Sequence, residues 1–303
     1  PVVAEPSSSA RPAREVVLAP ELVLAAGVLP APDRVLVVGR PTLSRAVGRL
    51  AASAPCDVVA SGSSWPDAGR RADRVLPAVP VPSGGEVDPA WLAAWRAASQ
   101  AAGQVLADGV EGLVEPAVAR EVLAAATGLL VVGSSKPVRD LFLWGPGAGR
   151  VLANRGVAGI DGMVSTAVGA ALAHGGQSYA LLGDLTFLHD ANGLVLGPHE
   201  PRPDLCVVVV SNDGGAIFGT LEQGGAGHEA AFERVFGTPH GVDLAALCAA
   251  TRTPHVRPTT RDELRAALRP APGLRVVEVR TDRHDAVALH ARLVAGVAAA
   301  LAP

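Results

Sequence analysis

The sequence has few aromatic residues, few cysteines and almost no excess of charge of either sign. Only 3% of the 303 residues are aromatic whereas 49% are hydrophobic, so aliphatic side chains must build the cores. A net charge of -3 gives no basic surface for nucleic acid, and we therefore expect no nucleic-acid partner. No apolar run approaches the roughly 20 residues of a membrane-spanning helix, so no membrane span is expected.

The three cysteines, Cys56, Cys206 and Cys248, are scattered without the spacing of a metal site or a disulfide framework. Cys206 lies in an apolar run and Cys248 in a helical pattern, so both are predicted to be small core residues. The N-terminus lacks the basic flank and hydrophobic core of a signal peptide. These features together predict a cytoplasmic protein.

Strand-like and helix-like segments alternate along the chain, which is typical of α/β proteins. Residues 1–14 are rich in Pro, Ser and Ala and indicate a flexible lead-in. Strands are expected at 35–39 and 56–60, but no GxGxxG motif follows them, so dinucleotide binding has little support. We predict two Rossmann-like, doubly wound domains with mainly parallel sheets, spanning 1–113 and 114–303.

The second domain is predicted to contain a larger set of elements. Its strands are expected at 129–133, 150–153, 179–182, 205–210 and 274–279. Its helices are expected at 117–127, 137–142, 163–173, around 189–196, and at 242–251, 261–268 and 285–301. The polar, glycine-bearing segment 222–238 is predicted to be a mobile active-site loop.

Two predicted strands end in oxygen-bearing residues followed by glycine. The strand at 179–182 leads to Gly183-Asp184, and the strand at 205–210 leads to Asn212, Gly214 and Gly215. Because ligands of open parallel sheets bind beyond the carboxyl ends of the strands, Asp184 and Asn212 are expected to converge. A carboxylate, an amide oxygen and a carbonyl suit Mg²⁺, which completes its shell with phosphate and water. Either motif alone fits an ordinary turn equally well, but the pair is more specific.

Basic side chains follow two other strand ends. Ser135 and Arg139 lie four residues apart at a helix start, where a hydroxyl and a guanidinium can bind a carboxylate. The alternative is an N-capping serine with a solvated arginine. Arg155 follows the strand at 150–153, and a surface salt bridge is its alternative. His189 and Asp190, at a helix start, indicate a structural or capping role.

The pair Gly183-Asp184 and Asn212, 28 residues beyond Asp184, resembles the signature of thiamine-diphosphate enzymes. Segments 154–162, 189–193 and 214–218 more specifically resemble the 2-succinyl-5-enolpyruvyl-6-hydroxy-3-cyclohexene-1-carboxylate (SEPHCHC) synthases of menaquinone biosynthesis. This resemblance covers nearly the whole chain. It implies a thiamine-diphosphate-binding fold, with a central domain at 1–113 and the diphosphate-binding domain at 114–303.

The resemblance also implies a cofactor, a metal ion and their ligands. Mg²⁺ or Mn²⁺ would be held by the side chains of Asp184 and Asn212 and the carbonyl of Gly214, and the metal would hold the diphosphate. Ile217 would hold the cofactor in its bent shape, and Phe218 would line the substrate pocket. The full set implied for thiamine diphosphate is Gly183, Asp184, Leu185, Thr186, Asn212, Gly214, Gly215, Ile217 and Phe218.

The implied substrates are two acidic molecules, 2-oxoglutarate and isochorismate. Ser135, Arg139 and Arg155 would contact them, together with Arg45 and, more weakly, Arg40. The implied reaction, a transferase reaction, is decarboxylation of 2-oxoglutarate and 1,4-addition of the succinyl carbanion to isochorismate, with release of CO₂.

The glutamate that activates thiamine in this family lies in an N-terminal pyrimidine domain and reaches the cofactor across a dimer interface. The sequence shows no such domain, so we expect no catalytic residue in this chain and no activity of the chain alone. The resemblance implies a homodimer or homotetramer in which the full-length chain supplies that domain.

Two other functions are compatible with the motifs. An acetolactate synthase or a 2-keto-acid decarboxylase would share the cofactor site, but apolar keto acids have little use for Arg139 and Arg155. A non-catalytic module that kept the fold would explain the missing glutamate, but the intact Asp184 and Asn212 argue against decay.

Overall fold

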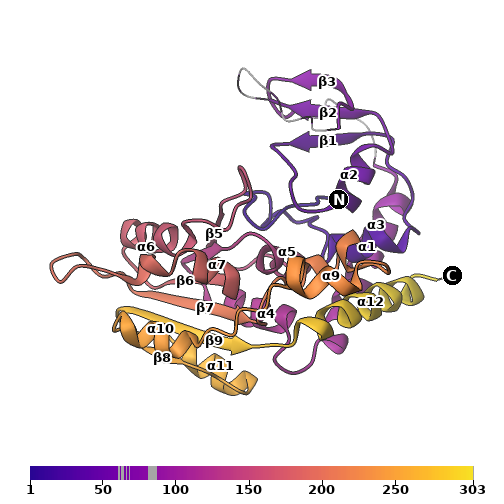
Figure 1. Ribbon diagram of the computed structural model, residues 1–303. Helices are drawn as coiled ribbons and strands as arrows, with labels where there is room; N and C mark the ends of the chain where they lie inside the picture. The colour runs from indigo at the N-terminus through magenta and orange to yellow at the C-terminus, as the bar shows by residue number, and fades with distance from the viewer. Residues whose placement is uncertain (61, 63–64, 66, 68, 81–86, 303) are drawn as a thin grey trace. The chain divides into compact units, whose positions relative to one another are not determined.

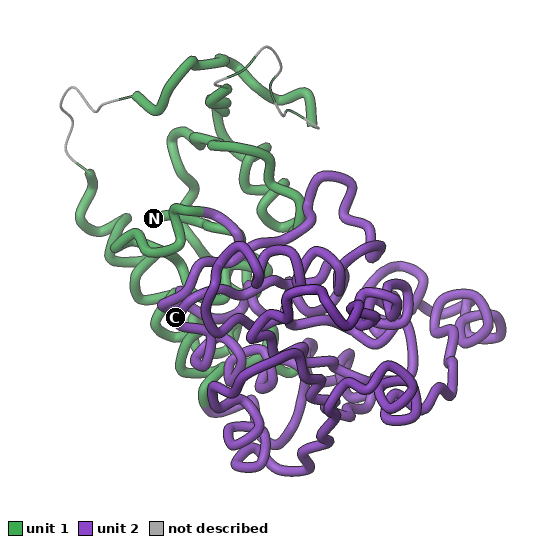
Figure 2. The backbone as a smooth tube through the Cα atoms, turned by 90° about the vertical axis from the view of Figure 1, so that its left-hand side faces the viewer, with its two compact units in different colours: residues 1–5, 9–107, 292–303 green, residues 6–8, 108–291 purple. Residues whose placement is uncertain are grey.

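The structure is a computed structural model that describes residues 1–302 except 61, 63, 64, 66, 68 and 81–86. The chain forms two compact units (Figure 2): unit 1 comprises residues 1–5, 9–107 and 292–303, and unit 2 comprises 6–8 and 108–291. Each unit contains its own parallel sheet. The predicted α/β class with parallel sheets is confirmed, while the predicted domain limit at residue 113 stays a prediction.

Unit 1 has a small parallel sheet in the order β1-β2-β3, and its first two strands were predicted from the sequence. Cys56, Asp57 and Val58 of β2 are buried, whereas the outer strands are more open. The side chain of Ser44 caps the helix that follows β1 by accepting hydrogen bonds from Ala46 N and Val47 N. The strands are β1 (Val35–Val38), β2 (Cys56–Val59) and β3 (Ala72–Leu76), and the helices are α1 (Pro20–Ala26), α2 (Arg45–Ala51) and α3 (Pro89–Gly109).

Unit 2 is built on a six-stranded parallel sheet in the order β5-β4-β6-β7-β9-β8 (Figure 1). Because β5 lies on one side of β4 and β6 on the other, the direction of winding reverses at β4, which is the doubly wound arrangement. Nearly every residue of the central strands is buried, as expected for a sheet covered on both faces. The strands are β4 (Leu129–Val132), β5 (Arg150–Ala153), β6 (Ser178–Gly183), β7 (Leu205–Ser211), β8 (His255–Val256) and β9 (Leu274–Arg280).

Helices cover both faces of this sheet. Alternate strand residues such as Val131 and Val207 pack with Met163 of α6 and Leu244 of α10 in one core. On the other face, α4 and α5 contact β6, and the hydroxyl of Tyr179 donates to the carbonyl of Leu268 at 2.6 Å. The helices that begin in unit 2 are α4 (Glu115–Ala125), α5 (Lys136–Leu143), α6 (Met163–His174), α7 (Asp184–His189), α8 (Ala216–Gly219), α9 (Glu229–Phe232), α10 (Leu244–Ala250), α11 (Arg261–Ala267) and α12 (Arg283–Ala300), of which α12 ends in unit 1.

The two cysteines predicted to lie in the core are buried, Cys206 in β7 and Cys248 in α10. Burial raises the pKa of each thiol to about 11, so neither is a reactive thiolate at neutral pH. Within the described part of the chain, no helix is both long enough and apolar enough to cross a membrane.

Two predictions of local structure are wrong. The helix expected around 189–196 begins earlier: α7 starts at Asp184, and only the short 3-10 turn η1 (Ala191–Leu194) follows it. The Asp184 carboxylate accepts a hydrogen bond from Leu185 N and places an acidic group in the first turn, which favours a helix there.

The segment 222–238, predicted to be a loop, forms three short helical turns instead. They are η2 (Glu222–Gly224), α9 and η3 (Glu233–Gly237). The rings of Phe232 and Phe236 lie 6.2 Å apart, and Glu233 forms an ion pair with Arg283. Composition suggested a loop because it does not show these side-chain contacts.

Candidate functional site

Neighbouring strands bring the two predicted metal ligands together. β6 pairs with β7 so that Gly183 lies opposite Val210, and each strand then delivers its polar residues at the same edge of the sheet. One oxygen of Asp184, Oδ2, accepts hydrogen bonds from Asn212 N at 3.0 Å and from Gly214 N at 3.1 Å. Its other oxygen accepts from Leu185 N at 2.7 Å. The predicted convergence of Asp184 and Asn212 is therefore present.

Asp184 is almost completely buried, with 2% of its surface exposed. Burial raises the pKa of its carboxyl group, and the hydrogen bonds from Leu185 and Gly214 and the nearby His240 oppose that rise. His240 Nε2 lies 3.4 Å from Asp184 Oδ2 and is buried without a hydrogen-bond partner among the described residues. Such a carboxylate gains from a cation that replaces the water it has lost.

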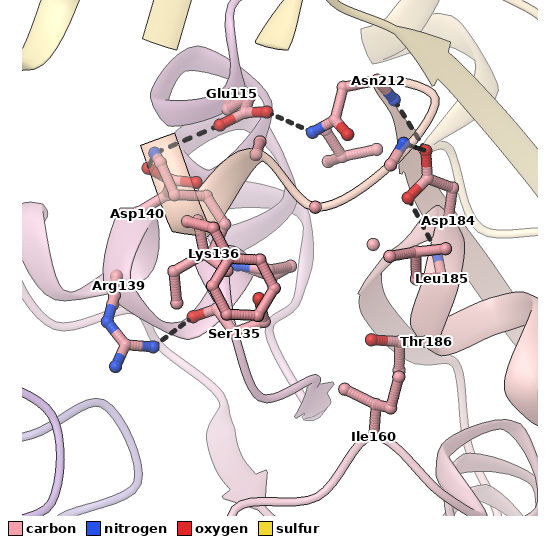
Figure 3. Close-up of a pocket in the computed structure, with 18 of the residues that line it drawn as sticks. Glu115, Ser135, Lys136, Arg139, Asp140, Ile160, Asp184, Leu185, Thr186 and Asn212 are labelled. Atoms are coloured by element: carbon pink, nitrogen blue, oxygen red, sulfur yellow. Dashed lines mark hydrogen bonds and ion pairs between the residues drawn. The ribbon is translucent and has the colours of Figure 1, made fainter. Parts of the chain in front are cut away.

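Asn212 is held at one end of its side-chain amide and unpaired at the other. Its Nδ2 donates to Glu115 Oε1 at 2.6 Å (Figure 3). Its Oδ1 is buried and has no hydrogen-bond partner among the residues that the structure describes. A buried amide oxygen without a partner costs about 1–3 kcal/mol unless a ligand satisfies it. This atom is therefore a candidate ligand for a metal ion.

The donor set fits Mg²⁺ or Mn²⁺ rather than a softer metal. In the described parts of the chain, no group of three or more His, Cys, Asp and Glu side chains gathers as a metal site. One carboxylate, Asp184, and one unpaired amide oxygen, that of Asn212, instead lie beside a cavity. Mg²⁺ accepts such a sparse set of protein oxygens and takes the others from phosphate and water.

Gly214 and Gly215 are required by the chain's own packing. Gly214 has φ of 140°, and a Cβ added there would lie 1.9 Å from the carbonyl oxygen of Gly237. A Cβ on Gly215 would lie 2.2 Å from the carbonyl oxygen of Phe236. The family resemblance places these glycines in the cofactor site, and the close approach that the structure shows there is by residues 236–237.

The predicted substrate residues Ser135, Arg139 and Arg155 come from the ends of β4 and β5. Arg139 Nη1 donates to the carbonyl oxygen of Ser135 at 2.6 Å, and Arg155 Nη1 donates to Ser134 Oγ at 3.1 Å. Ser135 has a positive φ of 75° and makes no side-chain cap to α5, so the N-capping alternative is wrong. Both arginines are half-buried rather than fully solvated.

A single cavity of about 300 Å³ connects these groups. In Figure 3, Arg139 lies on the side of this cavity away from Asp184. The cavity is lined by every residue predicted for cofactor or substrate except Arg40 and Arg45, which belong to unit 1. The predicted residues on its wall are Ser135, Arg139, Arg155, Gly183, Asp184, Leu185, Thr186, Asn212, Gly214, Gly215, Ile217 and Phe218.

Sequence reasoning missed three charged residues of the cavity wall, Glu115, Lys136 and Asp140. Lys136 Nζ lies 3.1 Å from Glu115 Oε2 and forms an ion pair with Asp140 as well. Burial lowers the pKa of Lys136, but the charges of Asp140 and Glu115 outweigh this and raise it above its ordinary value. The spacing of Lys136 and Asp140, four residues apart, could have indicated their pair, but nothing in the sequence indicated that Glu115 joins them.

Two apolar residues, Ile217 and Phe218, begin α8 beside the glycines and line the same cavity. The rings of Phe218 and Phe236 lie 5.5 Å apart, so the helical turns after residue 222 support Phe218. Ile217 is half-buried at this wall.

Asp190 has a structural role, as the sequence indicated. Its carboxylate accepts hydrogen bonds from Ser165 N at 2.6 Å and Ser165 Oγ at 3.0 Å, and so satisfies an amide in the first turn of α6. Gly193 lies so close to this turn that a Cβ would meet Ser165 N at 2.7 Å. His189 Nδ1 lies 3.1 Å from Asp161. The segment 189–193 therefore attaches η1 to α6.

Fold, site and sequence comparison agree on the class of protein. Residues 132–279 match the family described as "Thiamine pyrophosphate enzyme, C-terminal TPP binding domain". Thiamine pyrophosphate is the same compound as thiamine diphosphate, so unit 2 has the thiamine-diphosphate-binding fold that the motifs indicated. Asp184 and Asn212 both lie within the matched segment.

Within this class, the chain is a relative of the SEPHCHC synthases. It is 50% identical over 281 residues to the 2-succinyl-5-enolpyruvyl-6-hydroxy-3-cyclohexene-1-carboxylate synthase of Saccharopolyspora erythraea, which covers 89% of this chain and 50% of that protein. The synthase of Kineococcus radiotolerans is 49% identical over 318 residues, covering 100% of this chain and 57% of that protein. The chain thus spans about half the length of the curated relatives it matches, and the resemblance stated from its motifs is confirmed.

Proposed function

We propose that this chain binds thiamine diphosphate through a divalent cation and serves the SEPHCHC synthase reaction of menaquinone biosynthesis. The observation that carries the proposal is the cavity that joins an unsatisfied, oxygen-rich end at Asp184 and Asn212 to a cationic end at Arg139 and Arg155. A diphosphate with its metal suits the first end, and a dicarboxylic substrate suits the second. The sequence similarity to named synthases supports the same assignment.

At the oxygen-rich end, Asp184 and Asn212 would hold Mg²⁺ or Mn²⁺, with the Gly214 carbonyl as the third protein ligand. The backbone amides of Asn212 and Gly214 already fix the Asp184 carboxylate, so little order is lost on binding. The bound cofactor would also contact Gly183, Leu185, Thr186 and Gly215, which line the cavity. Ile217, which lines the cavity, would hold the cofactor in its bent shape.

At the cationic end, the half-buried guanidinium groups of Arg139 and Arg155 would bind substrate carboxylates. The Arg139 fork is oriented by its bond to the Ser135 carbonyl, and a guanidinium offers several N–H donors in a planar fork that matches a carboxylate. Ser135 and Phe218 complete this wall of the cavity. Arg45 stays a proposed substrate residue on the strength of the family resemblance alone.

When bound, thiamine diphosphate supplies a nucleophilic carbon that lets a 2-oxo acid lose CO₂ and retain an electron pair for a new carbon–carbon bond. The proposed acids are 2-oxoglutarate as donor and isochorismate as acceptor, which makes the reaction a transferase reaction. The activating glutamate, a dimeric or tetrameric assembly and a cytoplasmic location are parts of this proposal that rest on the family resemblance.

The nearest alternative function is that of a thiamine enzyme for apolar keto acids, such as an acetolactate synthase. Such an enzyme has little use for arginines that bind a second substrate carboxylate. Binding of 2-oxoglutarate and of pyruvate to the chain loaded with Mg²⁺ and thiamine diphosphate separates the two. The proposal predicts that 2-oxoglutarate binds at least about tenfold more tightly, because only its second carboxylate can reach an additional arginine. Equal binding of the two acids, or tighter binding of pyruvate, would reject it.

A further inference from the structure

We propose that Glu115 is a positioning residue for the metal site: it fixes the side-chain amide of Asn212 so that Oδ1, and not the NH₂ group, faces the cation. This inference rests on the proposed function, because it gives a role to Glu115 only if Asn212 binds a metal. Glu115 lies on α4, far from Asn212 in the sequence, and belongs to none of the motifs that identify the site.

The contact between the two side chains decides the orientation of the amide. Glu115 Oε1 accepts from Asn212 Nδ2 at 2.6 Å, a short distance typical of a charged acceptor. An ionised carboxylate has no hydrogen to donate, so it pairs only with the NH₂ end of the amide. The oxygen of Asn212 is then left buried and unpaired at the opposite end, which is the arrangement of a preformed ligand.

Glu115 is itself held in place by its burial and by a cationic neighbour. It is 3% exposed, lies in the first turn of α4, and has Lys136 Nζ 3.1 Å from its second oxygen. Lys136 in turn pairs with Asp140, one turn further along α5. Figure 3 shows Glu115 between Asn212 on one side and the Lys136–Asp140 pair on the other. The position of the Asn212 amide therefore depends on how α4 and α5 pack together.

This arrangement has two consequences for a bound cation. Without Glu115 the amide can rotate and present its NH₂ group, which cannot ligate a metal. In addition, the negative charge of Glu115 draws the amide hydrogens and increases the electron density on Oδ1, as carboxylates do for metal-bound histidines. Losing such a supporting group typically weakens metal binding by about 10- to 100-fold.

The test measures the affinity of the metal-free chain for Mn²⁺ by calorimetry in the presence of a fixed excess of thiamine diphosphate. In Glu115→Met the Lys136–Asp140 pair remains and is electrically neutral, so no charge is left unpaired. We expect Mn²⁺ binding about 10- to 100-fold weaker than in the wild type. Glu115→Gln retains a carbonyl oxygen that can accept from Asn212 and is expected to bind Mn²⁺ more tightly than Glu115→Met.

The matched control is Glu121→Met. Glu121 is also a buried acid of α4, paired with Arg265 at 2.9 Å, but it does not line the cavity. Its replacement should lower thermal stability without changing Mn²⁺ affinity. Equal losses of affinity in the Glu115 and Glu121 variants would mean that both act through general stability, and would overturn the inference.

A second measurement of Mn²⁺ affinity uses a variant of Asn212 and does not require Glu115→Met to fold. Asn212→Asp offers the metal a carboxylate, but that carboxylate would face the charge of Glu115. We expect Asn212→Asp to bind Mn²⁺ less tightly than the wild type, and Asn212→Asp with Glu115→Gln to regain affinity. Tighter binding by Asn212→Asp alone would overturn the inference.

The results also separate this inference from the proposed function. Absence of metal-dependent thiamine diphosphate binding in the wild type would reject the proposed function and the role of Glu115 with it. Wild-type binding that is unchanged in Glu115→Met would reject the role of Glu115 alone.

Discussion

The two ends of the cavity are built in different ways. At the oxygen-rich end, the carboxylate of Asp184 is fixed by three backbone amides, and the glycines beside it are in contact with backbone carbonyls. At the cationic end, Arg139 and Arg155 are long side chains that donate to Ser135 and Ser134, both of which follow β4. Backbone groups therefore fix the geometry of the oxygen-rich end, whereas the geometry of the cationic end depends on the conformations of two long side chains.

This difference predicts which changes each end tolerates. A backbone-fixed site should fail abruptly when a Cβ or a missing carboxylate disturbs it. A site made of long side chains on a strained helix start should lose affinity by degrees and leave the fold intact. Variants at and beyond the two ends test this contrast.

Gly214→Ala should have the largest effect on stability. The new Cβ would overlap the Gly237 carbonyl oxygen, and alanine strongly disfavours the φ of 140° found there. We expect a loss of about 3 kcal/mol or more in the free energy of unfolding, measured by urea denaturation, because strain and overlap act together.

Gly183→Ala is the matched control at the same edge of the sheet. A Cβ on Gly183 meets no atom within 4 Å, and Gly183 has an ordinary φ of -82°. Its stability should stay within about 1 kcal/mol of the wild type. If Gly214→Ala were as stable as Gly183→Ala, the oxygen-rich end would not depend on contact with residues 236–237.

Arg139→Ala should weaken substrate binding and leave cofactor binding unchanged. Removing one charged clamp should weaken binding of 2-oxoglutarate by about 10- to 100-fold, since a hydrogen bond to a charged group contributes about 1.5–3 kcal/mol. Binding of thiamine diphosphate with Mg²⁺ should be unchanged, as measured by calorimetry on the same preparation. Arg202→Ala, which removes an exposed arginine outside the cavity wall, is the control and should change neither.

The smallest expected effect concerns Glu278, a buried carboxylate whose partners are side chains, unlike Asp184, whose partners include three backbone amides. Burial raises the pKa of Glu278, but hydrogen bonds from Arg257, Arg280 and His255 outweigh this and lower it below its ordinary value. The stability that Glu278 contributes is therefore fully present above the ordinary glutamate pKa and is lost as pH falls through the lowered one.

Thermal denaturation at decreasing pH tests this point. Below the ordinary glutamate pKa, the wild type should lose stability more steeply than Glu278→Gln, which has no carboxyl group to protonate at this position. Parallel pH curves for the two proteins would show that the partners of Glu278 do not lower its pKa.

The sequence allowed the oxygen-rich end to be predicted but not its surroundings. Asp184 and Asn212 follow short, wholly apolar strands, and parallel pairing then brings strand ends together whatever the rest of the fold. Glu115 could not be predicted, because an acidic residue before a proline at a helix start looks the same whether it is exposed or buried. Its burial depends on the packing of α4 against β6 and β7.

Individual contacts also explain the errors in secondary structure. The helix α7 begins directly at Asp184 because the carboxylate bonds to the next amide, a contact that hydrophobic periodicity does not show. The segment 222–238 is polar and contains glycine, but Phe236 contacts Phe218 and Glu233 pairs with Arg283, both outside the segment. A local hydrogen bond decided the first case, and contacts with residues outside the segment decided the second.

The central claim is that Asp184 and Asn212 hold a divalent cation that binds the diphosphate of the cofactor. Calorimetric titration of thiamine diphosphate into the wild type and into Asp184→Ala, each with and without Mg²⁺, tests it most directly. The account predicts binding by the wild type that requires Mg²⁺, and its loss by about 100-fold or more in a folded Asp184→Ala. Binding that does not depend on Mg²⁺, or that survives the loss of Asp184, would contradict it.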